Sequence, residues 1–177
     1  MDVFLEYLLD KKSTSADILK KVGIVIAAFV VMLIVINVFA LFGQFMLTYV
    51  PLALAAIVYG AYVLMRNFNI EYEYIFTNGE LDIDVIKSRK VRKRLTSLST
   101  KNIELMARKE NSIYKRDFES EAIAKKYDAV FDPAKGGIFC AIYNVDGVRT
   151  MLTFQPPEKL AEAMKKMNPR AVILEEQ

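Results

Sequence analysis

An uncharged segment of 44 residues constrains this chain more than any other feature. Residues 22–65 contain no Lys, Arg, Asp or Glu, which the core of a soluble protein of this size does not produce. A single helix of that length would extend about 66 Å at ~1.5 Å per residue, roughly twice the thickness of the hydrocarbon layer. The segment is therefore expected to fold back near Gly43 and Gln44, which predicts two transmembrane helices at about 22–42 and 45–65.

The charges around this segment predict its orientation in the bilayer. Basic residues flank it on both sides, and they are Lys11, Lys12, Lys20, Lys21 and Arg66. Because the connecting turn carries no charge, the positive-inside rule places both termini in the cytoplasm of a multi-pass cell-membrane protein. A cleaved signal peptide is the alternative. Its apolar core would be about 7–15 residues long and would end in small residues, whereas this segment runs on into a second apolar span.

Composition narrows the classes of function. The 24 basic and 21 acidic residues leave a net charge of +3, too small to indicate a nucleic-acid partner. His and Trp are absent and Cys140 is the only cysteine, so the commonest general base and metal ligand are missing and one chain cannot form a disulfide. No phosphate-binding glycine loop, serine elbow or metal-ligand spacing occurs. We therefore expect a protein that is not an enzyme and that needs no cofactor or metal.

The first 21 residues are expected to form a cytoplasmic, amphipathic segment. If residues 2–12 are helical, one face collects four apolar side chains, those of Phe4, Leu5, Leu8 and Leu9. This pattern predicts a short helix that lies at the membrane interface or packs on the cytosolic domain. Thr14 and Asp17 then form a capping-box pattern, which would begin the first membrane helix.

Small residues recur four apart in both predicted spans. They are Gly23 and Ala27 in the first span, and Ala56 and Gly60 in the second. This spacing allows helix backbones to approach closely. We favour packing between the two spans of one chain, and the alternative is a contact in a homo-oligomer.

Beyond residue 70 the apolar period changes from helical to two, which is typical of strands. Asn78-Gly79 predicts a two-residue hairpin turn. The apolar face then fixes the pairs Phe76–Leu81, Tyr74–Ile83 and Tyr72–Val85. Asp146-Gly147 predicts a second hairpin within residues 137–154, with the pairs Tyr143–Thr150, Ala141–Leu152 and Phe139–Phe154.

A C-terminal helix is expected to complete the β domain. The second hairpin is also apolar on the face that carries Cys140 and Ile142, so that face must be covered. The amphipathic stretch at about 156–168 begins with prolines and ends at Asn168-Pro169, which makes it the candidate cover. Residues 66–177 thus predict one cytoplasmic domain of about 110 residues, within which residues 109–136 are ambiguous and include a possible helix.

Several motifs together resemble a known family. Two membrane spans are followed by "NIEYEYIFTNGELDID", later strands and a final helix that begins "FQPPEKLAEAM". This arrangement resembles small two-span bacterial membrane proteins with a pleckstrin-homology-like (PH-like) cytoplasmic domain. The resemblance implies an α+β membrane protein: a transmembrane helical hairpin followed by an antiparallel β-barrel or sandwich capped by a C-terminal helix. It implies no particular activity.

The resemblance does not extend to a phosphoinositide pocket. Phosphoinositide-binding members of the wider superfamily take their basic residues from the first strand pair and its loop. With residues 70–85 as that pair, the loop is Thr77–Asn78–Gly79–Glu80 and is surrounded by acids.

Residues 69–94 carry five acids and then six basic residues. If residues 88–90 form the next loop, Arg94 falls opposite Asp84 and Arg92 opposite Ile86. The loop itself would return to the membrane, because only residues 66–69 separate the second span from the first strand. We expect Lys87, Arg89 and Lys90 to bind anionic headgroups, since a basic residue near such a surface contributes about 1 kcal/mol. The alternative is a solvated or cross-strand-paired surface.

These observations favour a non-enzymatic membrane protein that presents its PH-like domain at the cytoplasmic membrane surface. Its expected partners are the bilayer, anionic headgroups and a membrane or cytosolic protein, with a homo-oligomer as a further possibility. The alternative is a structural or accessory subunit of a larger membrane complex that works through its transmembrane helices.

We predict that reporter proteins fused to either end of the chain will be active only as cytoplasmic reporters. The reason is that the basic residues flank two spans joined by an uncharged turn. A carboxyl-terminal reporter that is active outside the cytoplasm would contradict this topology. So would release of the chain from membranes by alkaline carbonate.

Overall fold

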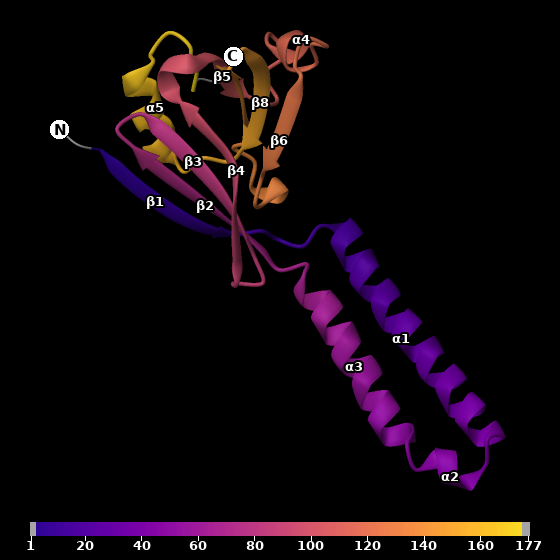
Figure 1. Cartoon of the computed structure of the whole chain (residues 1–177). Helices are drawn as coiled ribbons and strands as arrows, with labels where there is room; N and C mark the ends of the chain where they lie inside the picture. Colours follow the sequence, from indigo (N-terminus) through magenta and orange to yellow (C-terminus); the bar gives the residue numbers. More distant parts are fainter. Residues whose placement is uncertain (1–2, 175–177) are drawn as a thin grey trace. The chain divides into compact units, whose positions relative to one another are not determined.

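The computed structural model describes residues 3–174, except the side chain of Gln44. It consists of two units (Figure 1). One is the helical unit Ser13–Asn69, and the other is a β unit made of Met1–Lys12 together with Ile70–Gln177. The helical unit is therefore inserted into the sequence of the β unit.

The helical unit contains two helices long and apolar enough to cross a membrane, judged by length and composition. They include α1 (Ser15–Leu41) and α3 (Val50–Arg66), with the short α2 (Gln44–Leu47) between them. The predicted capping box is confirmed, because the Asp17 backbone N–H donates to Thr14 Oγ1 and the Thr14 N–H donates to the Asp17 carboxylate. This cap starts α1 seven residues before the predicted span, so that Lys20 and Lys21 lie within the helix.

The second apolar span is interrupted, which the sequence reading did not predict. After the turn at Gly43 (φ +89°), α2 ends at Leu47 and α3 begins at Val50. Pro51 lies in the first turn of α3. Proline has no N–H to donate, and the first turn of a helix is the place where none is required.

Three of the four small residues of the spans are exposed and do not pack in the contact between α1 and α3. Half-buried positions of α1 recur at Ala28, Met32, Val35 and Phe39. Gly23, Ala27 and Ala56 are exposed, and a Cβ added at Gly23 or Gly60 would meet no atom within 4 Å. The favoured interpretation, packing between the two spans of one chain, does not hold for Gly23 and Ala27, because they stand one position, about 100° of helix, away from the contact stripe. Gly60, in contrast, is half-buried. The oligomer contact stays a prediction.

The first four strands of the β unit form sheet A in the order β1-β2-β3-β4. They are β1 (Phe4–Asp10), β2 (Ile70–Thr77), β3 (Glu80–Lys87) and β4 (Val91–Ser99). The register of β2 and β3 confirms all three predicted pairs of the first hairpin. The apolar faces of β2 and β3 form the centre of the buried core.

The prediction of an N-terminal helix is wrong, because residues 4–10 form β1. Leu5, Tyr7 and Leu9 pair with Phe76, Tyr74 and Tyr72 and pack against the core. The helical pattern of Phe4, Leu5, Leu8 and Leu9 and the strand pattern of Leu5, Tyr7 and Leu9 fit the same letters. The open edge of β2 decides between them, and the β domain consequently begins before the membrane segment.

The first strand pair is β1 and β2, so Thr77–Glu80 is the second connection of the sheet and not the first.

Sheet B contains the other four strands in the order β5-β7-β8-β6. They are β5 (Ile103–Arg108), β6 (Lys125–Ala129), β7 (Phe139–Val145) and β8 (Val148–Phe154). The pairing of β7 with β8 confirms the second hairpin. The ambiguous residues 109–136 contain the short α4 (Lys115–Phe118) and β6, which pairs parallel to β8. Two single 3₁₀ turns, Thr100–Asn102 and Pro133–Lys135, complete the connections.

The C-terminal helix is confirmed as α5 (Glu158–Met167), but it covers a different face from the one predicted. Leu160 and Met164 of α5 are fully buried in the core between the sheets. The opposite face of β7 and β8, with Cys140, Ile142 and Met151, is covered instead by Phe118 and Ile123 from the connection that contains α4. That cover could not be recognised from the sequence because it is too short to be periodic.

Lys12, which follows β1, bonds to the connection after β6 through its backbone and its side chain. Its N–H donates to the carbonyl oxygen of Phe131 at 2.8 Å, and its Nζ lies 2.9 Å from Oδ2 of Asp132. The Asp132 side chain is only 3% exposed. The hydrogen bond from Lys12 holds the pKa of Asp132 below its usual range.

Replacing Lys12 with Gln is expected to lower the Tm of the full chain at pH 7. The margin, that is the difference in Tm between the unmodified chain and the variant, is expected to become smaller in acid. Since the folded pKa of Asp132 is depressed, its stabilising effect is present above the ordinary aspartate pKa of about 3.9 and is lost as the pH falls through the folded value. Thermal unfolding in detergent, followed by circular dichroism from pH 7 to pH 3, measures the margin. Lys11→Gln is the matched control. An unchanged margin across this range would contradict the role of the ion pair.

Candidate functional site on the charged face of sheet A

Both connections to the helical unit leave sheet A at the end where the β3–β4 turn lies. Asp10 pairs with Glu71, and the Lys11 N–H donates to the carbonyl oxygen of Ile70 at 2.9 Å. Ile70 in turn pairs with Lys87, the last residue of β3. The register of three adjacent strands thus brings the basic turn beside the two points where the chain enters and leaves the β unit.

The basic turn has a backbone conformation that its residues do not favour. Ser88 and Arg89 both have positive φ, +54° and +57°, and the Lys90 N–H donates to the Lys87 carbonyl oxygen at 3.1 Å. This is the geometry that the other two hairpins build with Asn-Gly and Asp-Gly. For side chains such as Ser and Arg this region costs about 1–2 kcal/mol per residue. The sequence therefore retains an unfavourable Arg at the tip of this turn.

Three arginines lie over a row of carboxylates on the outer face of sheet A. Arg89 Nε lies 2.8 Å from Glu71 Oε1, and an Arg92 terminal nitrogen lies 2.8 Å from Glu73 Oε1. Arg94 binds both Asp82 and Asp84. The predicted register is confirmed, because Arg94 pairs with Asp84 and Arg92 with Ile86. Burial acts to lower the pKa of the Arg94 guanidinium, but the hydrogen bond that it donates to Asp84 and its attraction to Asp82 raise that pKa overall. The carboxylates of sheet A therefore neutralise most of the arginine charge in this run.

The three predicted headgroup-binding residues differ in their surroundings. The Arg89 side chain is 80% exposed but bound to Glu71, and that hydrogen bond raises the pKa of its guanidinium. Lys87 and Lys90 are exposed and form no ion pair with any residue in the range 3–174. The two lysines are thus the cations of the turn that a ligand could bind without competition.

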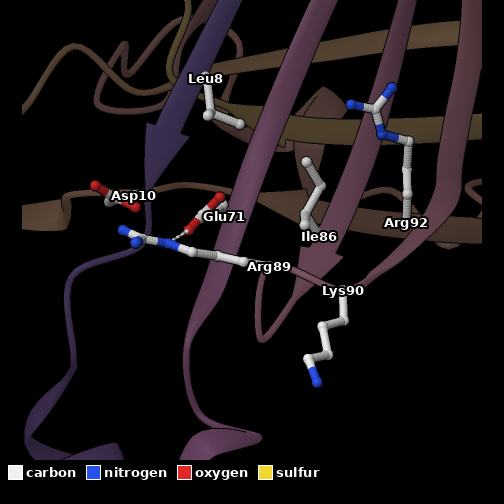
Figure 2. A pocket seen from close by; sticks show the side chains of 7 residues that line it. All are labelled: Leu8, Asp10, Glu71, Ile86, Arg89, Lys90 and Arg92. Atoms are coloured by element: carbon white, nitrogen blue, oxygen red, sulfur yellow. Dashed lines mark hydrogen bonds and ion pairs between the residues drawn. The ribbon is translucent and has the colours of Figure 1, made fainter.

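A hollow of about 430 Å³ lies beside the turn on the outer face of sheet A (Figure 2). All four strands or their turn contribute to it, through Leu8, Asp10, Glu71, Ile86, Arg89, Lys90 and Arg92. In Figure 2 the Arg89 guanidinium lies by Asp10 and Glu71, whereas the Lys90 side chain points away from them. Of the three cations around the apolar floor of the hollow, Arg89 and Arg92 are bound to Glu71 and Glu73, which leaves Lys90 to bind a small anionic group.

Sequence reasoning missed the contribution of β1 to this hollow. Leu8 and Asp10 stand opposite Glu73 and Glu71 on the outer face. The signal that could have found them is the alternation of Leu5, Tyr7 and Leu9, which puts Leu8 and Asp10 on the other side of a strand.

Among residues 3–174 no group of three or more His, Cys, Asp or Glu side chains could hold a metal ion. The Cys140 thiol is buried next to Thr153, and burial raises its pKa. A thiol held in its protonated form is a poor nucleophile.

Replacing Arg92 with Gln is expected to destabilise the fold by about 1–2 kcal/mol, because the Glu73 carboxylate would stay buried without its cation. The Glu73 side chain is only 5% exposed, whereas the Arg92 side chain is 56% exposed, so solvent screening keeps the loss below that of a fully buried pair. The free energy of unfolding of the full chain in detergent measures it.

A double-mutant cycle provides the control for this prediction. Glu73→Gln combined with Arg92→Gln removes both charges and is expected to recover part of the loss. If the two single losses simply add, Glu73 and Arg92 do not depend on each other.

Comparison with known proteins agrees with this architecture. The family model described as "Bacterial PH-like domain (DUF6106)" matches residues 1–174, which include both β1 and the helical unit. No curated protein and no solved structure matches the chain. The match covers nearly the whole sequence, and the structure has the expected, mainly antiparallel sheets with a C-terminal helix, although the two sheets do not close into a barrel. The chain therefore belongs to the bacterial PH-like domain family.

Proposed function

We propose that this chain is a non-enzymatic protein of the cell membrane that holds a PH-like domain at the cytoplasmic surface, where the basic turn binds anionic headgroups. The observation that carries the proposal is the register that puts Lys87 beside Ile70, at the end of sheet A where both connections leave. Binding at this place would orient the domain, since the spans already anchor it.

The short connections support this proposal. Four residues separate Asp10 from Ser15, and three separate Arg66 from Ile70. An extended chain covers at most about 3.5 Å per residue, so each connection reaches no more than roughly 14–18 Å between the elements it joins. A turn at the same end of the sheet would share this restriction, which is why its exposed lysines are candidates for contact with headgroups.

The charge on the turn also supports the proposal. Lys87 and Lys90 each add about 1 kcal/mol of attraction if they approach an anionic surface. Arg89 contributes less than a free cation, because Glu71 already binds it. Affinity of this size suits an orienting contact and would fail as an anchor on its own.

Lysine footprinting of the full chain in nanodiscs tests the proposal. We expect Lys87 and Lys90 to react more slowly with an acetylating reagent in nanodiscs with anionic lipid than in purely zwitterionic nanodiscs, because bound headgroups shield their amines. Lys115, Lys159 and Lys166, which are exposed on α4 and α5, serve as controls and should react equally in both. Equal reactivity of Lys87 and Lys90 in the two lipids, or slowing of all five lysines, would refute the contact.

A second candidate function is a structural or accessory subunit that acts through its helices. The exposure of Gly23, Ala27 and Ala56 favours it, because small residues that do not pack within the chain are available to another helix. Under this alternative, Gly23→Leu with Ala27→Leu is expected to release co-purifying membrane proteins, whereas Lys87→Gln with Lys90→Gln is expected to retain them. The opposite result would favour the headgroup or domain contact.

A further inference from the structure

Two strand edges of the β unit face each other across an open groove. Sheet A ends at β4 and sheet B ends at β6. Within residues 3–174, β4 pairs only with β3 and β6 pairs only with β8. An unpaired edge presents a row of backbone N–H and C=O groups that can pair with another chain.

The groove consists of two hollows that meet at Tyr127 of β6. The first hollow, of about 490 Å³, has an apolar wall formed by Val85, Val91 and Leu95. The second, of about 320 Å³, is lined by β4 at Thr96 and Ser97 and by side chains of sheet B that include Tyr143 and Val148. Because successive residues of β4 line the two hollows, the groove follows the free edge of this strand, which Figure 1 shows beside β6.

Another edge in the same domain shows how an extended segment can cover such a strand. At β5, the Met106 N–H donates to the Ala171 carbonyl oxygen and the Ile173 N–H donates to the Met106 carbonyl oxygen, both at 2.7 Å. Val172 lies between them, fully buried. The domain thus pairs a short extended segment of its own chain with one strand edge, whereas the edge of β4 has no such cover within the described residues.

The charges around the groove indicate an acidic occupant. Four basic residues line it, and they are Lys87, Lys93, Arg94 and Lys125. Arg94 is bound to Asp82 and Asp84, but Lys93 and Lys125 form no ion pair with the described residues. Asp146 is the acidic residue in the lining of the second hollow. Unpaired positive charge therefore lies on both sides of the groove, at Lys93 of β4 and at Lys125 of β6.

We propose that an extended, acidic segment of a partner protein binds in this groove by adding to sheet A as a strand next to β4. Its backbone bonds to the free edge of β4. Every second side chain enters the hollows beside Tyr127, where apolar side chains meet Val91 and Leu95 and acidic side chains lie near Lys93 and Lys125. About six residues, near the usual length of a strand, would follow β4 from Val91 to Ser97. Lys87 borders both this groove and the proposed headgroup contact, but the strand addition rests on β4, Lys93 and Lys125 and does not depend on that contact.

A selection experiment with the full chain in nanodiscs tests the proposal. The probe is a displayed pool of random dodecapeptides. We expect sequences that combine acidic and apolar residues to be enriched at least tenfold, and expect this enrichment to be lost on a Lys93→Glu, Lys125→Glu variant. A Lys159→Glu, Lys166→Glu variant carries the same change of charge on α5 and is expected to retain it. Absence of enrichment on the unmodified chain, or equal enrichment on both variants, overturns the proposal.

Hydrogen exchange on the unmodified chain gives a second readout that does not depend on the folding of a variant. An enriched peptide is expected to slow exchange of backbone amides of β4 between residues 91 and 97, because they become bonded to the added strand. The same peptide with N-methylated amides at alternate positions should lose its binding. Protection elsewhere, or undiminished binding of the methylated peptide, excludes strand addition at β4.

Discussion

The pairing of β1 with β2 is the interaction on which the rest of the structure depends. These two strands are neighbours in sheet A, yet the whole helical unit lies between them in the sequence. Because an antiparallel pair brings the end of one strand beside the start of the next, the pairing requires both ends of the helical unit to return to the same place. A hairpin of two long helices meets that requirement, and one continuous helix of the same length would not.

Electrostatics within sheet A determine which charges remain for a ligand. Glu71, Glu73 and Asp84 are buried on the outer face, and burial of a carboxylate is costly unless a cation binds it. The arginines from the turn and from β4 supply those cations, so a run of six basic residues leaves mainly its lysines unpaired. Two of these lysines lie at the end of the sheet from which the chain connects to the helices, and the third, Lys93, lines the groove beside β6.

The parts of the fold with local signals could be predicted, and the parts that depend on distant segments could not. Asn78-Gly79 and Asp146-Gly147 occupy the positive-φ positions of tight turns, so each fixes the register of its own hairpin and, with it, the opposition of Asp84 and Arg94. The strand β1 was mistaken for a helix because seven residues fit both periods, and only its partner 60 residues later decides. The groove was missed for the same reason, since no local pattern reveals which strands will be left at the edges of two sheets.

The most direct measurement of the central pairing is a disulfide formed across it in the membrane. Glu6 and Ile75 stand opposite each other, whereas Ser97 lies three strands away in the same row, about 14 Å at ~4.8 Å per strand. In a Cys140→Ser background, Glu6→Cys with Ile75→Cys should cross-link under mild oxidation, and mass spectrometry should detect the joined peptides. Glu6→Cys with Ser97→Cys should not cross-link. Failure of the first pair to cross-link, or equal cross-linking of the second, would contradict the insertion of the helical unit between two adjacent strands.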